Sequence, residues 1–360
     1  MKIKNLFFLT LSLVTANSCV SCYYVRTSVH HDFSMDREIL FHPDSMEVER
    51  IRNARKTSSD SASGAWNLRM LHADSVLTRD FFGEEETFTA MAFRHADRLE
   101  DLSWELPAID KASEASYDPA EKIWKRFRWF YTYYTYEATF PSLKDRLPLP
   151  LDDYLEKDEQ EFYLRRAGSP QGRNGIEVYT TLDDLNSKFM RWAGDCIFKI
   201  HYDALYEYVP AAGQVALKAA EDSLARAFDS EDLIRLTMDD FVKTIDGYFN
   251  RHPLHQAPSF RKLYVSGKVM IDSRIEDKLD LMAYFEKVYM HRVTLPGKYV
   301  KGNPACLEGG DPVWKIDAYR LLSGNYVTEA TSRTPNGWAF SITGLTVLLL
   351  LLCACKGFRK

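Results

Sequence analysis

Hydrophobic residues alternate with polar residues near both ends of the chain, which is the period of β-strands. The alternating runs lie at residues 23–42, 66–70, 87–93, 289–295, 313–316 and 326–332. The first run is interrupted by the polar turn Asp32-Phe33-Ser34-Met35 and therefore predicts a β-hairpin. Pro296-Gly297 and Gly324-Asn325 predict turns between the later runs. The pattern thus predicts strands before residue 110 and after residue 287.

Between these two parts, apolar residues recur at helical spacing. Asp118-Pro119-Ala120-Glu121 has the composition of a helix start, with an Asp N-cap, Pro at the first helical position and Glu three residues after the cap. Apolar residues then follow at helical spacing as far as Pro141, so a helix is predicted from 119 to 140. Six of the eight residues from Trp129 to Tyr136 are aromatic, which favours a buried aromatic helix face over a ligand-stacking surface.

More helices are predicted at residues 155–166, 181–200, 211–228, 237–248 and 273–287. Thr181 and Thr237 are candidate N-caps, because each is followed three residues later by an Asp. In the Ala-rich helix 211–228, Val215 and Leu224 are expected to face inward. No unit of 20 to 50 residues repeats, so the pattern does not predict a solenoid.

This order of strands, helices and strands predicts an α+β fold. In the simplest arrangement, one mixed sheet is built from the N- and C-terminal segments, and the helices form a subdomain inserted between them. A separate helical domain between two unrelated β pieces would leave each piece with few strands for a core. The predicted boundaries are 23–110 for the N-terminal β part, 111–286 for the helical subdomain and 287–335 for the C-terminal β part.

An apolar stretch near the C-terminus is long enough to cross a membrane. Residues 338–355 read WAFSITGLTVLLLLLCAC, carry no charge and span about 27 Å as a helix, close to the roughly 30 Å of a bilayer core. We predict a transmembrane helix at 336–356 and a tail at 357–360. The basic residues after the apolar stretch predict a cytoplasmic C-terminus and an extracytoplasmic body; they are Lys356, Arg359 and Lys360.

The N-terminus has the layout of a secretory signal peptide. Two lysines precede an apolar stretch, residues 5–16, that is too short to span a membrane. Cys19 and Cys22 then follow small residues, and this end resembles a bacterial lipobox, in which a diacylglyceryl group is attached to the Cys that becomes residue one. Cys19 is slightly favoured because it lies closer to the apolar stretch. An ordinary cleaved signal peptide within 1–22 is the alternative.

The charge of the exported part excludes one class of partner. Five of the 46 basic residues lie in the terminal segments, which contain no acidic residue, so 41 basic residues face 51 acidic ones and the body carries a net charge of −10. This balance argues against nucleic acid as a partner and against docking on anionic lipid by charge. Cys196 and Cys306 are the body's cysteines. They can form a disulfide in an oxidising compartment or remain separate thiols, and their spacing does not decide between the two.

Candidate catalytic chemistry is sparse. The sequence contains no P-loop, dinucleotide-binding, zincin or nucleophile-elbow motif. His30-His31-Asp32 and the pair His252 and His255 are weak metal candidates, because neighbouring strand residues point to opposite faces and the second pair is isolated. No catalytic residue, cofactor site or metal site is therefore predicted.

Both ends of the chain together resemble a known family. A signal sequence ending in Cys precedes a β-hairpin, and the return segments VTLPGKYVKGN (293–303) and VWKIDAYRLLSGNY (313–326) precede the apolar span. In this order they resemble the LppM-like membrane-anchored bacterial lipoproteins. The resemblance covers residues 1–40 and 291–360. It implies an envelope-anchored α/β domain and transfers no catalytic residue.

The favoured function is therefore non-enzymatic. We expect a cell-membrane protein, held by its C-terminal helix and by an N-terminal lipid, that presents its body to a partner protein, lipid or envelope polymer. The inserted helices are expected to carry the specific function, because they depart from the resemblance. The alternative is an extracytoplasmic hydrolase with a site between the sheet and the helical insert, where pockets tend to form.

Overall fold

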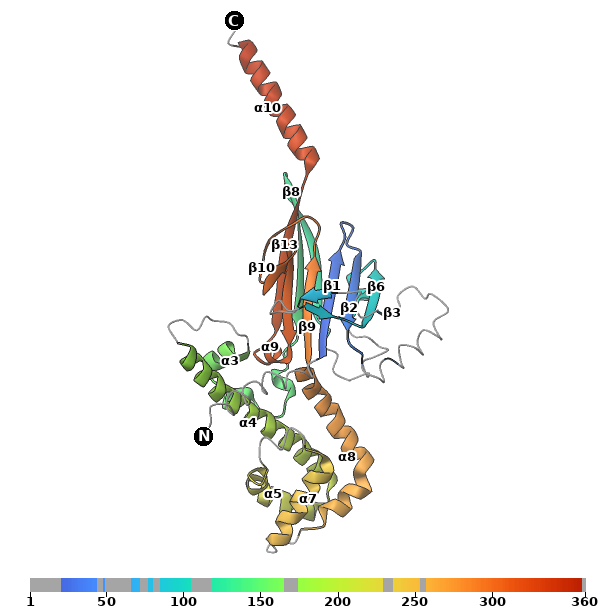
Figure 1. The fold of residues 1–360 in the computed structure, drawn as a ribbon, viewed down its shortest axis with the longest axis vertical. Helices are drawn as coiled ribbons and strands as arrows, with labels where there is room; N and C mark the ends of the chain where they lie inside the picture. Colours follow the sequence, from blue (N-terminus) through green and yellow to red (C-terminus); the bar gives the residue numbers. More distant parts are fainter. Residues whose placement is uncertain are drawn as a thin grey trace.

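The computed structural model describes residues 21–43, 48, 66–71, 77–79, 85–104, 118–164, 174–228, 236–252 and 257–357. It confirms the α+β prediction: two β-sheets pack face to face, and a group of helices is inserted between strands of the two chain ends (Figure 1). Most of the predicted signal peptide, including Cys19, and the metal candidate His255 lie outside the described residues.

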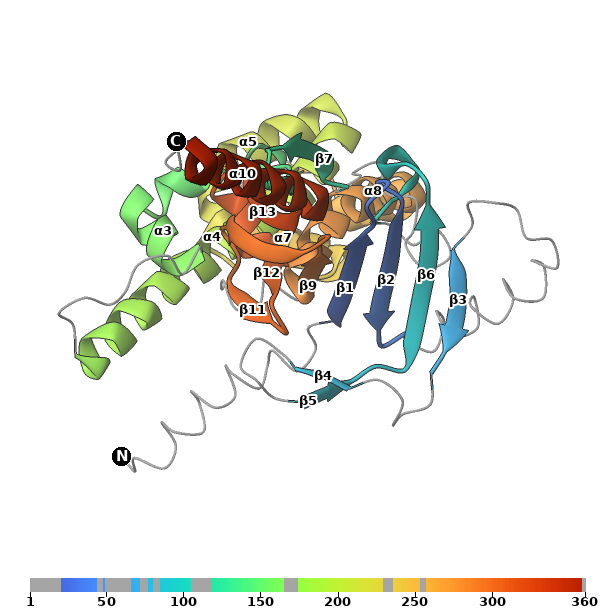
Figure 2. The same cartoon turned by 90° about the horizontal axis from the view of Figure 1, so that it is seen from above.

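The larger sheet has seven strands in the order β11-β12-β9-β1-β2-β6-β3. Their bounds are β1 (Ser21–Val29), β2 (Met35–Phe41), β3 (Asn67–Met70), β6 (Ala90–Ala96), β9 (Lys287–Thr294), β11 (Cys306–Glu308) and β12 (Asp311–Asp317). Figure 2 shows β1, β2, β6 and β3 side by side. β1 pairs antiparallel with β2 and parallel with β9, where Val25 lies opposite His291. One mixed sheet is therefore built from both ends of the chain, as the sequence predicts.

The smaller sheet has four antiparallel strands in the order β10-β13-β8-β7. Their bounds are β7 (Ala120–Phe127), β8 (Tyr131–Phe140), β10 (Lys298–Gly302) and β13 (Tyr326–Pro335). A separate two-stranded sheet pairs β4 (Leu77–Arg79) with β5 (Glu85–Thr87).

The β7–β8 hairpin shows that the helix predicted from 119 to 140 is wrong. Asp118 does not cap a helix; its carboxylate accepts hydrogen bonds from the Trp104 amide and the Ser103 hydroxyl. Near the end of β8, Tyr136, Ala138 and Phe140 are buried at a spacing of two. Thr, Tyr and Phe favour strands, and this composition outweighed the coincidental helical spacing of the aromatic residues.

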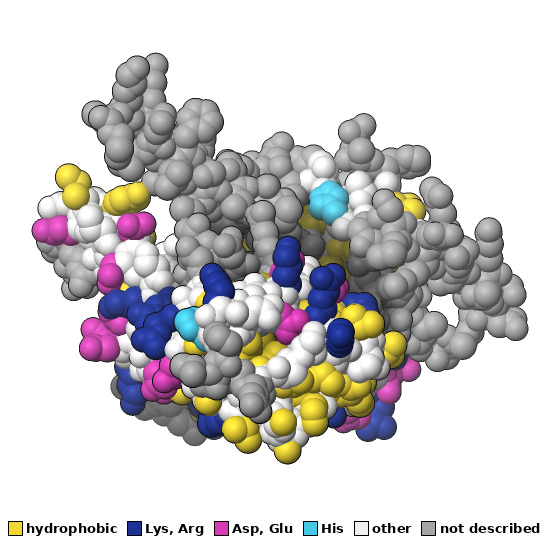
Figure 3. All heavy atoms as spheres, turned by 90° about the horizontal axis from the view of Figure 1, so that it is seen from below, with side chains coloured by type: hydrophobic (Ala, Val, Ile, Leu, Met, Phe, Trp, Pro, Cys, Tyr) yellow, Lys and Arg dark blue, Asp and Glu magenta, His cyan; other side chains and the backbone are white. Residues whose placement is uncertain are grey.

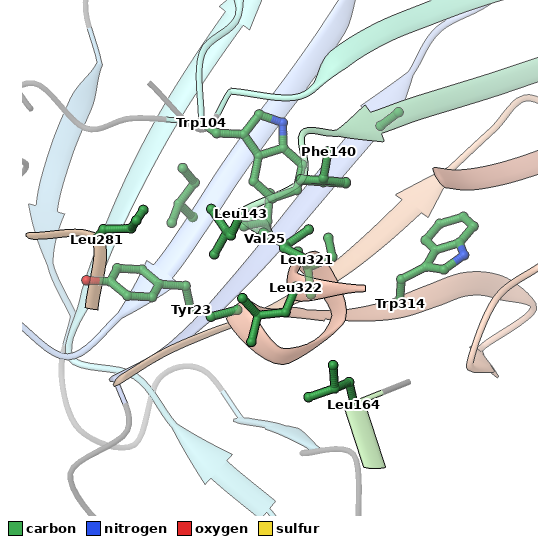
Figure 4. Close-up of a cluster of buried hydrophobic side chains, with 14 of the residues drawn as sticks. Tyr23, Val25, Trp104, Phe140, Leu143, Leu164, Leu281, Trp314, Leu321 and Leu322 are labelled. Atoms are coloured by element: carbon green, nitrogen blue, oxygen red, sulfur yellow. The ribbon is translucent and has the colours of Figure 1, made fainter. Parts of the chain in front are cut away.

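The main core lies between the two sheets and continues beneath them. Figure 4 shows Val25, Trp104, Phe140 and Trp314 in this core, together with leucines from the connecting segments. Short helical segments close its lower edge: η3 (Lys144–Arg146), η4 (Leu151–Asp153), η5 (Ala283–Glu286) and α9 (Ala318–Leu322). A further segment, η2 (Leu99–Asp101), follows β6.

A second core belongs to the helical module, which we define as α4, α5, α7 and α8. The inserted helices are α3 (Lys157–Leu164), α4 (Gly175–Tyr208), α5 (Ala211–Ala225), α7 (Met238–Arg251) and α8 (Phe260–Met282). α4 joins the two cores, because Trp192 packs in the sandwich core and Leu205 in the module's core. α4 begins before the predicted Thr181, since Asn174 caps it in a capping box. Thr237 caps α7 as predicted, by accepting a hydrogen bond from the Asp240 amide.

The last helix, α10 (Gly337–Gly357), follows β13 directly. Its segment Gly337–Ala354 is long and apolar enough to cross a membrane, and almost all of it is exposed. α10 leaves the sandwich at the end opposite the helical module (Figure 1). We call these the α10 end and the module end of the sandwich.

Candidate functional site

A buried polar cluster links the two sheets. Arg37 of β2 donates to Glu121 Oε1 of β7 over 2.6 Å and to Thr27 Oγ1 of β1 over 3.2 Å. Tyr136 of β8 donates its hydroxyl to the same Glu121 oxygen. Thr27 Oγ1 lies 3.0 Å from Nε2 of His291 on β9. Five strands thus contribute one side chain each to a network that crosses from one sheet to the other.

Burial sets the ionisation of this cluster. Burial would lower the pKa of Arg37, but attraction to the Glu121 carboxylate and the hydrogen bond to it raise that pKa above its usual value. Burial and the neighbouring Glu121 raise the pKa of Tyr136 well above its usual value. Burial, followed by repulsion from Arg37, lowers the pKa of His291 well below its usual value. Arg37 is therefore charged, while Tyr136 and His291 are neutral.

This arrangement suits cohesion between the sheets better than chemistry on a substrate. The side chain of Arg37 is fully buried and that of Glu121 is 5% exposed, so solvent and substrate do not reach the charged pair. The Arg37 guanidinium lies over the Trp104 ring at 5.1 Å, and the His291 ring meets Trp104 edge-on with centroids 4.6 Å apart. The Trp104 Nε1 and His291 Nδ1 atoms are buried without a hydrogen-bond partner among the described residues. The cluster fixes the β7–β8 hairpin on the larger sheet.

A second polar cluster lies on the surface at the α10 end. Asp36 accepts hydrogen bonds from His30 Nε2 at 2.9 Å and from His95 Nδ1 at 2.7 Å. His31 instead contacts the Tyr134 hydroxyl at 3.1 Å, and Asp32 accepts from the Ser34 amide in the turn. The three residues of the predicted His30-His31-Asp32 candidate thus have three separate partners. Among the residues that the structure describes, no group of three or more His, Cys, Asp or Glu side chains is arranged to hold a metal ion.

The pKa values at this surface cluster move in opposite directions. The hydrogen bond to Asp36 raises the pKa of His95 above its usual value. Burial alone would raise the pKa of Asp36, but hydrogen bonds from His95 and His30 lower the pKa of that carboxyl below its usual value. The cluster is therefore an ion pair in mildly acidic solution.

The β7–β8 hairpin is bonded to the first turns of α10. The Asn336 amide donates to the Phe130 carbonyl at 2.9 Å, and its side chain donates to the Arg128 and Trp129 carbonyls at 2.8 and 3.1 Å. Its side-chain oxygen accepts from Thr132 at 2.8 Å. One asparagine thus closes the hairpin turn and fixes the direction in which α10 leaves the sheet.

Aromatic rings surround this junction. We define the aromatic tip as Phe127, Trp129, Phe130 and Tyr131 of the hairpin. Phe127 stacks on Trp338 with ring centroids 6.2 Å apart, and Phe130 lies 4.8 Å from Phe340. Trp129 Nε1 donates to Thr343 Oγ1 at 2.8 Å. Sequence reasoning missed this surface because it placed the aromatic run on a buried helix; the arginine-flanked turn between two β-prone runs is the signal that would have found it.

The module end exposes a different set of apolar side chains. Val269 of α8 is 87% exposed, and Val265, four residues earlier on the same face, is also exposed. Val215 of α5 is exposed as well, so its predicted inward orientation is wrong. Leu224 faces the module's core as predicted, and Leu217 does so too. Figure 3, which views this end, shows hydrophobic side chains among basic and acidic ones.

The body's two cysteines are separate thiols in the structure. Cys196 of α4 is buried in the sandwich core, and Cys306 of β11 is exposed. Burial raises the pKa of Cys196 to about 12. The disulfide that the sequence left open is therefore not formed here. Cys22 in β1 is half-buried, whereas Cys19 lies outside the described residues.

Comparison with known proteins adds little to this geometry. The chain matches no protein-family model and no curated protein. A solved structure similar to it is the folded domain of LppM from Mycobacterium tuberculosis, determined by NMR, with a TM-score of 0.25 and 8% sequence identity. The match covers 88% of this chain and 91% of that domain. This similarity is too loose to assign a function to the chain.

Proposed function

We propose that the protein is an exported, membrane-anchored binding or accessory protein of the bacterial envelope, of the LppM-like kind, without a catalytic role. The observation that supports this most is the placement of α10 and the helical module at opposite ends of one sandwich (Figure 1). α10 is suited to anchor the protein in the membrane. The module is then held away from the membrane surface, where a partner protein can reach it.

The basic tail supports one orientation of the anchor. Lys356, Arg359 and Lys360 follow the apolar segment and favour a cytoplasmic C-terminus. Cys306 is exposed on the body, whereas Cys353 lies near the far end of the apolar segment of α10, next to the basic tail. A membrane-impermeant maleimide added to right-side-out spheroplasts should label Cys306 and not the C-terminal cysteines, and C306S should abolish that labelling. Labelling of the C-terminal cysteines alone would reverse the proposed topology.

The sheet register bears on the N-terminal lipid anchor. Cys22 pairs with Val288 at the start of β1, and β1 then runs seven residues to Val29, roughly 23 Å away. Beyond Val29, His31 contacts Tyr134, which is paired with Ser332 close to the start of α10. Cys22 therefore lies at the module end, whereas α10 begins at the other end.

A lipid on Cys22 would reach the membrane of α10 only if the first residues of β1 left the sheet. Cys19, three residues earlier, extends this reach by about 10 Å at most. We therefore propose α10 as the anchor and, in place of the N-terminal lipid that the sequence favours, a signal peptide that is cleaved without lipid attachment. A diacylglyceryl group on Cys19 or Cys22 is the alternative. The intact mass of the mature protein separates the two, because lipid attachment adds a diacylglyceryl mass to a chain that begins at one of these cysteines.

The face of α8 that carries Val265 and Val269 is the proposed contact for a partner protein. Both side chains are exposed, while the opposite face of α8 packs in the module's core through Phe260, Tyr264 and Ile271. A photo-crosslinking amino acid at position 269 in living cells should give a discrete protein adduct. The matched control is the exposed Lys243 on α7, which should give none.

V265D with V269D should abolish an adduct formed from another position on the same face, such as 262, without unfolding the module. Absence of any adduct from positions 262, 265 and 269 would reject a protein partner at this face. The full chain in its native membrane is the sample in each case.

A further inference from the structure

The aromatic tip contacts α10 well inside its apolar segment. Trp129 donates to Thr343, which lies six residues after Gly337, where the apolar segment begins. At about 1.5 Å per residue, Thr343 lies roughly 9 Å into that segment. The hairpin therefore runs beside the first turns of the proposed membrane helix and does not end above it.

The apolar segment is no longer than the hydrocarbon core that it would cross. Its 18 residues span about 27 Å, slightly less than the roughly 30 Å thickness of a hydrocarbon core. If α10 crosses the membrane, the helix must enter the hydrocarbon close to Gly337. Whatever lies beside Thr343 then lies within the membrane interface or at the boundary with the acyl chains.

We infer that residues 127–131 form a second membrane contact, in which the aromatic tip is seated in the interfacial layer of the leaflet that α10 enters. The exposed rings fit this layer, since Phe127 is 57% exposed and Trp129 is 47% exposed in the described structure. Trp and Tyr prefer this depth, where the ring meets acyl chains and the polar atom meets headgroups. Trp338 and Phe340 continue the same ring of aromatic side chains on α10.

The strands above the tip carry the charge that phospholipid headgroups require. Residues 122–136 contain four basic residues and no acidic residue, although the body as a whole has a net charge of −10. Arg126 lies near the end of β7, three residues before Trp129 and at most roughly 10 Å from it along the chain, on the side of the tip where the phosphates of the leaflet are expected. Arg333 of β13 stacks over Tyr131 at 4.5 Å. The expectation from net charge, that the body does not dock on anionic lipid, is therefore revised for this hairpin.

The contact also fixes how the body stands on the membrane. The hairpin is bonded to α10 through Asn336 and to the larger sheet through Glu121 and Arg37. A helix and a hairpin seated together resist tilting of the sandwich, so the module end points away from the surface. The inference rests on the proposed membrane crossing by α10 and adds lipid headgroups as a specific partner of the hairpin.

The test uses the full chain reconstituted in phosphatidylcholine–phosphatidylglycerol vesicles whose acyl chains are brominated near the headgroup. Bromine quenches tryptophan emission at short range, so W129F should remove a measurable share of the quenching seen in the wild type. The matched control W66F, in a tryptophan beside β3, should leave the quenching unchanged. R126E with R333E should abolish the increase in quenching as the phosphatidylglycerol fraction rises, whereas K262E on α8 should not.

Alkaline extraction of the same vesicles distinguishes failure of the proposed membrane anchor from failure of the hairpin contact. Protein that is extracted from the vesicles has no membrane-crossing helix, which overturns the proposed anchor and this inference with it. Protein that is retained, while W129F and the wild type are quenched equally, overturns the hairpin contact alone. A third outcome is that the difference in emission between the wild type and W129F is unaffected by bromine and yet changes with the protein-to-lipid ratio. That result would assign the tip to contacts between copies of the chain and would overturn the hairpin contact with lipid.

Discussion

The two ends of the sandwich both expose apolar side chains, but they differ in kind. At the α10 end the exposed residues are aromatic, lie beside an apolar helix and are flanked by basic residues without acidic ones. At the module end they are mainly aliphatic, stand on helices with a core of their own and lie among charges of both signs (Figure 3). The first set has the composition expected of the proposed membrane contact and the second that of the proposed protein contact.

The comparison teaches that exposure alone does not identify a partner. Val269 is more exposed than Trp129, yet only Trp129 is tied to a helix that can cross a membrane. The surroundings of an exposed residue, not its hydrophobicity, separate a lipid contact from a protein contact. If the two surfaces have different partners, a substitution at one end should leave the contact at the other end unaffected.

The largest effect is expected where the hairpin joins the body. E121A removes the partner of Arg37 and leaves a buried positive charge uncompensated, so the free energy of unfolding should fall by about 3–5 kcal/mol. Denaturant unfolding of the purified full chain in detergent, followed by tryptophan fluorescence, measures this. The matched control is E38A, whose surface pair with Arg26 at 3.7 Å should contribute less than about 1 kcal/mol.

Equal effects of E121A and E38A would show that the hairpin is not held by the buried pair. In that case the aromatic tip would not be a fixed part of the sandwich. Its seating beside α10 would then have to come from the junction alone.

A smaller effect is expected at the junction itself. N336A removes the side-chain hydrogen bonds that close the hairpin turn on α10 and should cost about 1–2 kcal/mol locally. In reconstituted protein, the amides of residues 128–131 should exchange faster with deuterium. The matched control N325A removes a hydrogen bond to the Ser142 amide at the module end and should leave exchange at the tip unchanged. Unchanged exchange at 128–131 in N336A would refute the role of this residue.

Substitutions at the two surfaces should separate their functions with little change in stability. V269K on α8 should alter the free energy of unfolding by less than about 0.5 kcal/mol and should remove the partner adduct without changing lipid quenching. F130S at the tip should reduce lipid quenching of Trp129 and leave the adduct in place. Loss of both properties from either single variant would mean that the two ends do not act independently.

The sequence predicted the parts of this molecule that depend on local pattern. The β1–β2 hairpin, the capped helix after Thr237 and the apolar segment of α10 all appear where their periods and caps indicate. The single sheet built from both chain ends was also predicted, because isolated β pieces cannot bury a core.

The rest depended on contacts that no local pattern contains. The aromatic run from Trp129 to Tyr136 satisfies both a helical and a two-residue period, and its pairing with β13, almost two hundred residues later, decides between them. Arg37 and Glu121 read as ordinary surface charges until the two sheets bring them together. The aromatic tip could not be predicted while its strand was taken for a helix.

The smallest effect is expected from pH at the surface cluster of His30, Asp36 and His95. The raised pKa of His95 means that its contribution to stability is fully present below its unfolded value of 6.5 and is lost as pH rises through the folded value. The lowered pKa of Asp36 means that its contribution is present above 3.8 and is lost as pH falls through the folded value. H95Q should therefore destabilise the full chain more at about pH 5.5 than at about pH 8.5, as measured by denaturant unfolding at the two pH values. A pH-independent effect of H95Q would mean that the ring contributes by packing and not by its charge, and the α10 end would then have no pH-sensitive element at this cluster.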